Sequence, residues 1–243
     1  MLEAGQLFPS LGSLEFLRPF FSTTSQPWEW LPAIADALRA MPLHISSDCR
    51  RIGQVLIHPS ASVDSSAHIV GPAFIGADCR IGPNALLREN VFCGNCCTVG
   101  HGSEIKNSLL LDGVTVPHRN YVGDSILGRG AHIGAGVVLA NLRLDGLPVR
   151  VHGPSGSTAT GLRKCGSFLG DGSQVGCNAV LLPGTVLGQG AWVHAAISFS
   201  GHLPDGCEAF LPQRPILRRR KSFEKPPLGA DGWEADGPNL CNP

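Results

Sequence analysis

The chain has 243 residues, of which 43% are hydrophobic, and its 19 basic residues balance its 19 acidic residues. A net charge of zero argues against nucleic acid or an anionic membrane surface as the main partner. The sequence has no run of about 20 apolar residues, which a membrane-spanning helix would need, and Glu3 stands near the start without a basic lead-in, which argues against a signal peptide. We therefore expect no membrane span and a cytoplasmic location.

Residues 1–50 are expected to form an amino-terminal adapter with one short helix. Residues 1–25 contain apolar patches interrupted by proline and glycine, which indicates an irregular segment that lies against a larger body. Residues 32–40 give the clearest helical pattern, because Pro32 suits a first turn and Pro42 follows as a stop. About fifty residues are too few for a nucleotide-binding α/β domain, so we expect no uridylyl transfer from this segment.

From residue 57 onward, aliphatic side chains recur at every sixth position. The series is Ile57, Val63, Ile69, Ile75, Ile81, Leu87, Val99, Ile105 and Leu111, with the apolar Cys93 in the one remaining place. Helices and alternating strands have periods of 3.6 and 2, so neither explains a period of six. A fixed period of this kind is typical of a repeat fold. Three hexads would form one coil, the aliphatic residues would point inward, and successive coils would stack as parallel strands about 4.8 Å apart.

The regular period is interrupted twice after Leu111. Pro117 takes the next inward place, and the phase then slips before the series resumes at Leu127. The repeat is lost again in the polar, glycine-rich stretch 141–164, which we expect to be a projecting loop, because long loops in compact folds are usually functional or disordered. The period returns over residues 169–199.

The β-helix is expected to span residues 51–214, and residues 215–243 are expected to form a flexible tail. Proline, glycine and charged residues dominate this tail, which is a composition typical of disorder. We interpret its basic run, residues 218–221, as a solvated segment rather than a phosphate site.

The nine cysteines are scattered and odd in number, which favours a reducing compartment over a disulfide framework. Cys93 and Cys96 form a CxxC pair, and Cys97 follows directly. A zinc site would need a second pair of ligands nearby, and Cys93 already occupies an inward position. We therefore expect these cysteines to pack in the core, and we expect no metal site.

The stretch from Val116 to Gly146, VPHRNYVGDSILGRGAHIGAGVVLANLRLDG, adds a second and more specific pattern. Its polar residues and those before it, separated in turn by 18, 12, 3 and 20 positions, are Arg88, Lys106, His118, Tyr121 and Asn141. With this joint spacing, the chain from about Ile57 to Arg214 resembles the hexapeptide-repeat acetyltransferase domain of the bifunctional glucosamine-1-phosphate acetyltransferase/UDP-N-acetylglucosamine uridylyltransferase. It also resembles related sugar-phosphate nucleotidyltransferase-like proteins. The resemblance implies an all-β fold, a left-handed parallel β-helix.

The resemblance also implies roles for these residues. His118 would be the general base, Arg88 and Lys106 would hold a sugar phosphate, and Tyr121 and Asn141 would fix the sugar ring. The residue types suit that chemistry. A protonated sugar amine must lose a proton before it attacks a thioester, and an imidazole, whose usual pKa is near 6.5, accepts one at neutral pH. Lysine and arginine give charge-assisted hydrogen bonds to phosphate.

Coenzyme A would lie along the later coils. The resemblance assigns Ala135, Cys177 and Ala195 to this site, where small residues let the pantetheine arm approach the backbone, and it assigns Arg214 to a coenzyme phosphate. Small residues at these places also suit tight corners, so Ala135 alone does not separate the two interpretations.

Two positions depart from the family pattern. Leu147 stands where the bifunctional enzymes carry a lysine that reaches the substrate phosphate, and His132 stands where they carry an asparagine. Loss of a cation weakens phosphate binding, and Arg143 or Arg150 in the same stretch would compensate for it. These departures leave the acceptor open.

The resemblance therefore implies a homotrimer that transfers acetyl from acetyl-CoA to an amino-sugar 1-phosphate. Glucosamine 1-phosphate, in UDP-N-acetylglucosamine synthesis, is the first candidate. One alternative is an acyltransferase with another amino sugar or a sugar nucleotide as acceptor. A further alternative is a scaffold subunit without catalytic activity that pairs with a separate nucleotidyltransferase.

Overall fold

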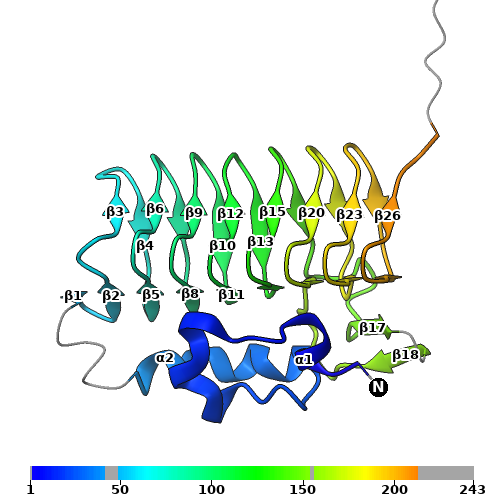
Figure 1. The fold of residues 1–243 in the computed structure, drawn as a ribbon, viewed down its shortest axis with the longest axis horizontal. Coiled ribbons are helices and arrows are strands. Elements are labelled where there is room, and N and C mark those ends of the chain that lie inside the picture. Colours follow the sequence, from blue (N-terminus) through cyan, green and yellow to red (C-terminus); the bar gives the residue numbers. More distant parts are fainter. Residues whose placement is uncertain (1, 42–48, 154–155, 213–243) are drawn as a thin grey trace, which may run out of the picture. The chain divides into compact units, whose positions relative to one another are not determined.

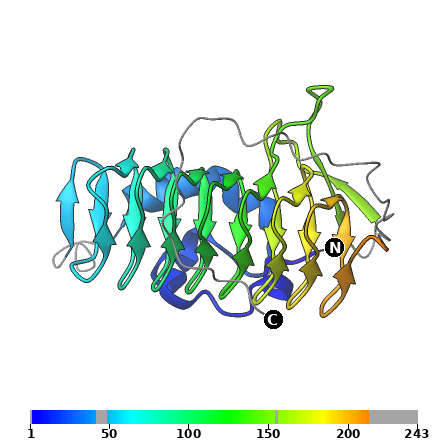
Figure 2. The ribbon, with the colours of Figure 1, turned by 90° about the horizontal axis from the view of Figure 1, so that it is seen from above.

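The structure, a computed structural model, describes residues 2–41, 49–153 and 156–212, and the chain up to Leu211 forms one compact unit. In this unit the chain winds into a parallel β-helix whose coils stack along one axis (Figure 1, Figure 2). Each coil supplies one short strand to each of three faces. On each side of the coil an aliphatic residue points inward and is buried along the axis. The predicted fold class, a left-handed parallel β-helix, is confirmed. The predicted tail, residues 215–243, lies outside the described residues.

In the described residues, the three faces contain nine, eight and seven strands. Face 1 consists of β1 (Arg50–Ile52), β2 (Val55–Ile57), β5 (Ala73–Ile75), β8 (Val91–Cys93), β11 (Ser108–Leu110), β14 (Ile126–Leu127), β19 (Phe168–Leu169), β22 (Val186–Leu187) and β25 (His202–Leu203). Face 2 consists of β3 (Ser62–Val63), β6 (Arg80–Ile81), β9 (Thr98–Val99), β12 (Thr115–Val116), β15 (His132–Ile133), β20 (Gln174–Val175), β23 (Trp192–Val193) and β26 (Glu208–Ala209). Face 3 consists of β4 (His68–Ile69), β7 (Leu86–Leu87), β10 (Glu104–Lys106), β13 (Tyr121–Gly123), β16 (Val138–Leu139), β21 (Val180–Leu181) and β24 (Ser198–Phe199).

The column of side chains inside the β-helix follows most of the six-residue series and includes Cys93, which is fully buried. The assignment of Leu111 and Pro117 to this interior is wrong. Leu110 belongs to the interior column, Leu111 belongs to a second cluster that contains the amino-terminal segment, and Pro117 is partly exposed.

The reason for this correction is a short coil. Ser108 pairs with Val91, so this coil has 17 residues, because Asn107 is the single residue between β10 and β11. The interior positions therefore move forward by one residue at Leu110, and a second shortening moves them again at Leu127. The period slips at two corners, and the first of them comes before the place that the sequence indicated.

The amino-terminal segment covers the outside of face 1 (Figure 1). Its elements are α1 (Ala4–Leu7), the 3₁₀ helices η1 (Gly12–Phe20) and η2 (Pro27–Ala33), and α2 (Ile34–Arg39). The predicted helix over residues 32–40 thus begins in η2 and continues as α2. The outward residues of face 1 are apolar and buried under this segment: Leu56, Phe74, Phe92, Leu109, Ile126, Phe168 and Val186. Face 1 is therefore apolar on both surfaces, as a sheet covered on both sides must be.

The stretch expected to be a projecting loop contains regular secondary structure. It contains an antiparallel hairpin of β17 (Arg150–Gly153) and β18 (Gly156–Ala159). Val149 and Val151 at its base are buried in the same cluster as the amino-terminal segment, which anchors the hairpin. We call residues 142–164 the arm.

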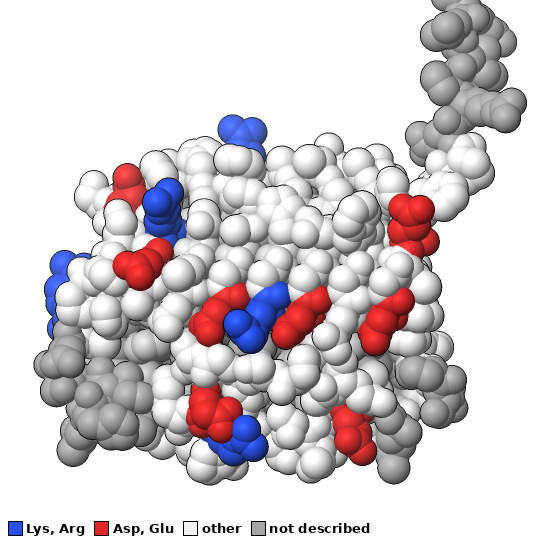
Figure 3. Space-filling view, viewed as in Figure 1, with Lys and Arg blue, Asp and Glu red and all other residues white. Residues whose placement is uncertain are grey.

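The charged side chains do not form a broad patch of one sign on the face shown in Figure 3, where acidic and basic residues are interspersed. Among the described residues, no helix combines the length and the apolar character needed to cross a bilayer.

Candidate active site

Four of the predicted site residues form a column along the corner between faces 2 and 3, which we call the corner column. Its members are His118, Ala135, Cys177 and Ala195. Hydrogen bonds of 2.8 to 2.9 Å join successive coils here, and their donors and acceptors are Gly136 N–H to the His118 carbonyl, Asn178 N–H to the Ala135 carbonyl and Ala196 N–H to the Cys177 carbonyl. The sequence separation of these residues varies from 17 to 42, and the stacking of coils still brings them to equivalent places.

His118 is exposed at this corner. Its backbone N–H donates to the Oδ1 of the buried Asn120 at 2.9 Å, which fixes the turn that carries the ring. The imidazole lines a cleft of about 420 Å³ together with Ala135 and with His101, which occupies the same corner one coil earlier. His101 is therefore the counterpart of His118 on the preceding coil.

The later members of the column lie beside a second cleft, of about 290 Å³, on the outside of face 2. It is lined by Cys177, Ala195, Trp192 and His132, among other residues. The thiol of Cys177 is free and exposed. Arg214, expected to contact a coenzyme phosphate, lies outside the described residues.

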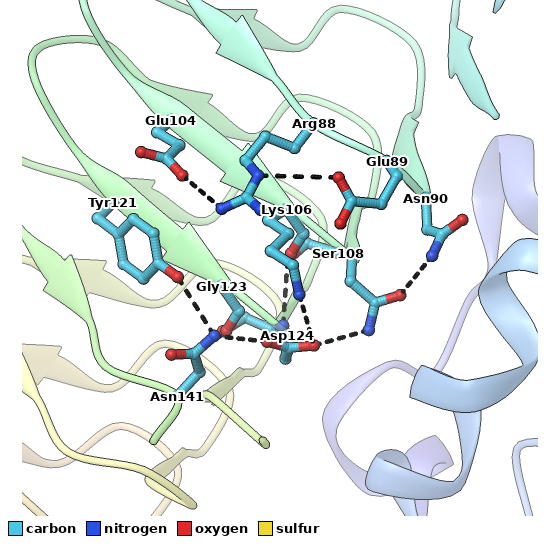
Figure 4. A network of polar contacts seen from close by, with 12 residues as sticks. Arg88, Glu89, Asn90, Glu104, Lys106, Ser108, Tyr121, Gly123, Asp124 and Asn141 are labelled. Atoms are coloured by element: carbon cyan, nitrogen blue, oxygen red, sulfur yellow. Dashed lines mark hydrogen bonds and ion pairs between the residues drawn. The ribbon is translucent and has the colours of Figure 1, made fainter. Parts of the chain in front are cut away.

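The other predicted site residues meet on the outside of face 3 (Figure 4). The Arg88 guanidinium donates to Glu104 Oε1 at 3.1 Å, and its Nε lies 3.7 Å from Glu89 Oε2. The amide nitrogen of Asn141 lies 3.2 Å from the hydroxyl oxygen of Tyr121. The structure therefore brings Arg88, Lys106, Tyr121 and Asn141 into one region, which we call the face 3 network.

Asp124 joins the members of this network, and the sequence analysis missed it. Its side chain is only 6% exposed, and the ammonium of Lys106 lies 3.8 Å from its Oδ1. Asn107 donates to Oδ1 at 2.8 Å, and Asn141 donates to Oδ2. A buried carboxylate is stable only with such partners, so Asp124 holds Lys106 and Asn141 in place.

A signal for Asp124 was present in the sequence. Asn90, Asn107 and Asp124 are each 17 residues apart, and all three have a positive φ of 45° to 63°, a conformation that asparagine and aspartate tolerate better than most residues. A polar residue at the same corner of three successive coils forms a ladder, and Asn90 indeed donates to Asn107 at 3.2 Å. The sequence pattern puts the change of period after Pro117, so it does not align these three residues.

The surroundings of the network raise the pKa of three groups. Partial burial raises the pKa of the Tyr121 hydroxyl, against the hydrogen bond from Asn141. The hydrogen bond to Glu104 raises the pKa of the Arg88 guanidinium. Burial raises the pKa of the Cys165 thiol to about 12, with the charge of Asp124 as the second cause, so Cys165 is not a nucleophile at neutral pH.

Strand β13 of face 3 links the corner column to the network. Tyr121 is the first residue of β13, and His118 lies on the corner that leads into this strand. Gly123 on the same strand lets the side chains of Asn141 and Tyr121 lie directly over it, because a Cβ atom there would lie 2.6 Å from the Asn141 amide and 2.7 Å from the Tyr121 hydroxyl. Lys106, Asp124 and Asn141 lie toward the other edge of face 3, where the chain enters face 1. A small polar ligand on this face would thus contact the network and approach His118.

One departure from the family pattern, Leu147, lies in the arm, and the other, His132, is the first residue of β15 on face 2. Leu147 is 58% exposed. Arg143 pairs with Asp145, and Arg150 donates to the hydroxyl and the carbonyl of Ser157 at 2.8 and 2.9 Å. Both arginines line a third cleft beyond Asn141.

We expect Asp124→Asn to lower the free energy of unfolding by about 1 to 3 kcal/mol, because an amide offers one acceptor oxygen to Asn107 and Asn141 where the carboxylate offers two, and Lys106 loses its partner. The measurement is urea unfolding followed by circular dichroism. Asp145→Asn, on the exposed part of the arm, is the matched control and should change stability little. Equal stability of the Asp124→Asn protein and the wild type would contradict the role given to Asp124.

Comparisons with known proteins agree with the resemblance found in the sequence. A family model described as the GMPPB C-terminal domain matches residues 69–155. The bifunctional sugar-1-phosphate nucleotidylyltransferase/acetyltransferase of Sulfurisphaera tokodaii is 36% identical over 142 residues, which are 58% of this chain and 35% of that protein. The bifunctional protein GlmU of Methanococcus aeolicus is 30% identical over 218 residues, 84% of this chain and 51% of that protein.

The chain thus spans about half or less of the length of these relatives. Among solved structures, the acetyltransferase domain of PglB from Neisseria gonorrhoeae aligns with 64% of this chain and 53% of that chain, at 22% identity and a TM-score of 0.32. The predicted resemblance is confirmed: this chain is related to the bifunctional sugar-1-phosphate nucleotidylyltransferase/acetyltransferases, of which it matches a part.

Proposed function

We propose that this protein transfers the acetyl group of acetyl-CoA to the amine of an amino-sugar 1-phosphate, with glucosamine 1-phosphate, in UDP-N-acetylglucosamine synthesis, as the first candidate. The observation that carries the proposal is that β13 links the corner column to the face 3 network, since His118 lies three residues before Tyr121, the first residue of this strand. An imidazole begins a row of small residues on one corner, and the adjoining face carries a cluster of two cations, an amide and a phenol. An acetyl transfer to an amino sugar needs these groups together.

The chemistry at His118 is a proton transfer coupled to acyl transfer. The amine nitrogen attacks the thioester carbonyl carbon, a C–N bond forms, and the C–S bond breaks. The imidazole takes the proton that the amine must lose, and it then returns this proton to the departing coenzyme sulfur as the thiol forms. A positioned base of this kind contributes about 10² to 10⁴ to the rate.

The donor would lie along the corner column. Ala135 and Ala195 have short side chains, which let a pantetheine arm approach the backbone, and Cys177 stands between them. Arg214 would bind a phosphate of the coenzyme. The name of the Sulfurisphaera tokodaii relative, which describes it as an acetyltransferase, supports this choice of donor.

The acceptor would lie on the face 3 network. Arg88 and Lys106 would bind its phosphate, and Tyr121 and Asn141 would fix its ring. Glu104 partly neutralises the charge of Arg88, and Asp124 partly neutralises the charge of Lys106. A bound phosphate therefore has to compete with these two carboxylates.

We also propose a homotrimer in which neighbouring β-helices pack through faces 2 and 3. The amino-terminal segment covers face 1, so this face is closed to another copy. A site on the edge between faces 2 and 3 would then receive residues from a neighbour. We further propose that the protein acts in the cytoplasm. A separate nucleotidyltransferase is its proposed partner.

The decisive experiment is an assay of thiol release from acetyl-CoA with a panel of amino sugars and amino-sugar phosphates. Release with an amino-sugar phosphate, and formation of its N-acetyl product, supports the enzyme. No release with any acceptor supports the alternative of a scaffold subunit without catalytic activity.

We expect Arg88→Ala and Lys106→Ala to raise KM for a phosphorylated acceptor at least tenfold, because each variant loses a charge-assisted hydrogen bond worth about 1.5 to 3 kcal/mol. The unphosphorylated amino sugar should be affected much less. Arg80→Ala, which removes an exposed arginine on face 2, is the control. Equal effects on the two acceptors would mean that Arg88 and Lys106 do not contact a phosphate.

A further inference from the structure

A cleft beside the arm has no role in acetyl transfer as proposed above. It has a volume of about 730 Å³ and lies between the end of face 3 and the arm. Ala140 and Leu182 form its floor, and Leu144 of the arm contributes apolar surface. The charged groups at this cleft are Arg143, Arg150 and Asp145, which gives two cations against one anion, together with the imidazole of His152.

The floor of this cleft continues the face 3 network. Lys106 pairs with Gly123 across neighbouring coils, and the same register, continued through β16 and β21, brings Gly123 next to Ala140 and Ala140 next to Leu182. Coils in such a helix stack about 4.8 Å apart. The side chains of Tyr121 and Asn141 lie over Gly123. A sugar held by these two side chains therefore has the floor of the cleft within about 5 to 10 Å, which a group linked to its C1 oxygen can reach.

The chemistry of the lining favours a ligand with an apolar ring and phosphates. Aliphatic side chains suit the faces of a planar base, and guanidinium groups bind phosphate through paired hydrogen bonds. Arg150 is held ready for this by its two bonds to Ser157, which use two of its five N–H groups. A cleft of this volume is in the range that holds a complete cofactor-sized ligand, which is more than a single sugar phosphate needs.

We propose that the natural acceptor is an amino sugar linked through its C1 oxygen to a nucleoside diphosphate, whose base lies on Ala140 and Leu182 and whose phosphates face Arg143 and Arg150. This inference rests on the proposed acetyl transfer, and it replaces the free sugar 1-phosphate by a nucleotide-linked amino sugar as the acceptor. It also accounts for Leu147, because a diphosphate bound by the two arginines does not need a lysine at that place.

The nucleotide part of the coenzyme is the other source of the same chemistry. The corner column, where the coenzyme is proposed to lie, runs along the edge between faces 2 and 3. The cleft lies at the opposite edge of face 3, where Pro183 leads into face 1. The position of the cleft therefore favours the acceptor.

The test compares glucosamine 1-phosphate with UDP-glucosamine in the thiol-release assay, with the GDP- and dTDP-linked sugars as further probes. We expect kcat/KM to be at least tenfold higher for one of the nucleotide-linked sugars. Leu182→Trp, which fills the floor, should raise KM for that acceptor at least tenfold and leave KM for acetyl-CoA unchanged. Val70→Trp, on an exposed residue at the other end of face 3, is the matched control.

A binding measurement makes the result independent of activity. UDP, GDP and dTDP are titrated into the wild-type protein by calorimetry, and we expect one of them to bind. Leu182→Trp and Arg143→Ala should each lower the affinity for that nucleotide at least fivefold. Binding without thiol release from any acceptor would support the cleft and reject the acetyl transfer. Efficient acetylation of glucosamine 1-phosphate with no nucleotide binding would overturn the inference and leave the acetyl transfer standing. If Leu182→Trp raised KM only for acetyl-CoA, the cleft would belong to the coenzyme, and the inference about the acceptor would also be overturned.

Discussion

His118→Ala is expected to lower kcat for acetyl transfer by about 10² to 10⁴ while the protein remains folded, because the variant loses the proposed proton acceptor of the attacking amine. The ring is exposed on a corner, and only the backbone N–H of His118 is bonded to the buried Asn120. Truncation of the side chain therefore leaves the fold intact. The measurement is the rate of thiol release at saturating substrate, together with the circular dichroism spectrum.

The matched control for this variant is His101→Ala. His101 lies at the same corner one coil earlier and lines the same cleft, so it tests whether any imidazole at this edge serves as the base. We expect His101→Ala to keep most of the activity. A His118→Ala protein that retains more than about a tenth of the wild-type kcat would exclude the general-base role, and a larger loss in His101→Ala would transfer that role to His101.

Ile105→Asp is expected to unfold the β-helix. Ile105 is fully buried in the interior column, where the residues of neighbouring coils are apolar, so a carboxylate there has no partner. An unpaired buried charge costs several kcal/mol, and the total stability of a domain is only about 5 to 15 kcal/mol. Solubility and the cooperativity of thermal unfolding measure the effect.

The control is Val70→Asp, which places the same carboxylate on an exposed position of the same face. We expect this protein to melt within a few degrees of the wild type. The neighbour of Ile105 shows why position decides the outcome, since Glu104 points outward and bonds to Arg88. If Ile105→Asp melted cooperatively near the wild-type temperature, the assignment of residue 105 to the interior would be wrong.

The sequence by itself determined the coil, most of the inward residues and the identity of the corner residues. Each of these depends on local spacing. An aliphatic residue at every sixth position leaves only a three-sided coil that buries all of them, so Ile57, Ile81 and Ile105 were placed correctly. Residues separated by multiples of a coil reach equivalent corners, which is why His118 and Ala135 lie next to each other.

The errors arose where one residue changes the length of a coil. Leu110 and Leu111 are both apolar and adjacent, and both surfaces of face 1 are buried, so hydrophobicity does not distinguish the inward residue from the one under the amino-terminal segment. The pairing of Ser108 with Val91 decides this, and pairing is a property of two coils together.

Tertiary structure alone decided the electrostatics and the clefts. The sequence shows Lys106 only as a cation that is available to bind a phosphate. In the fold its ammonium pairs with Asp124, a buried residue 18 positions further along the chain. The third cleft exists because Val149 and Val151 anchor the arm beside face 3. The pattern of single residues predicts where the backbone turns, whereas charge pairing and cavities depend on which coils and arms become neighbours after the chain has folded.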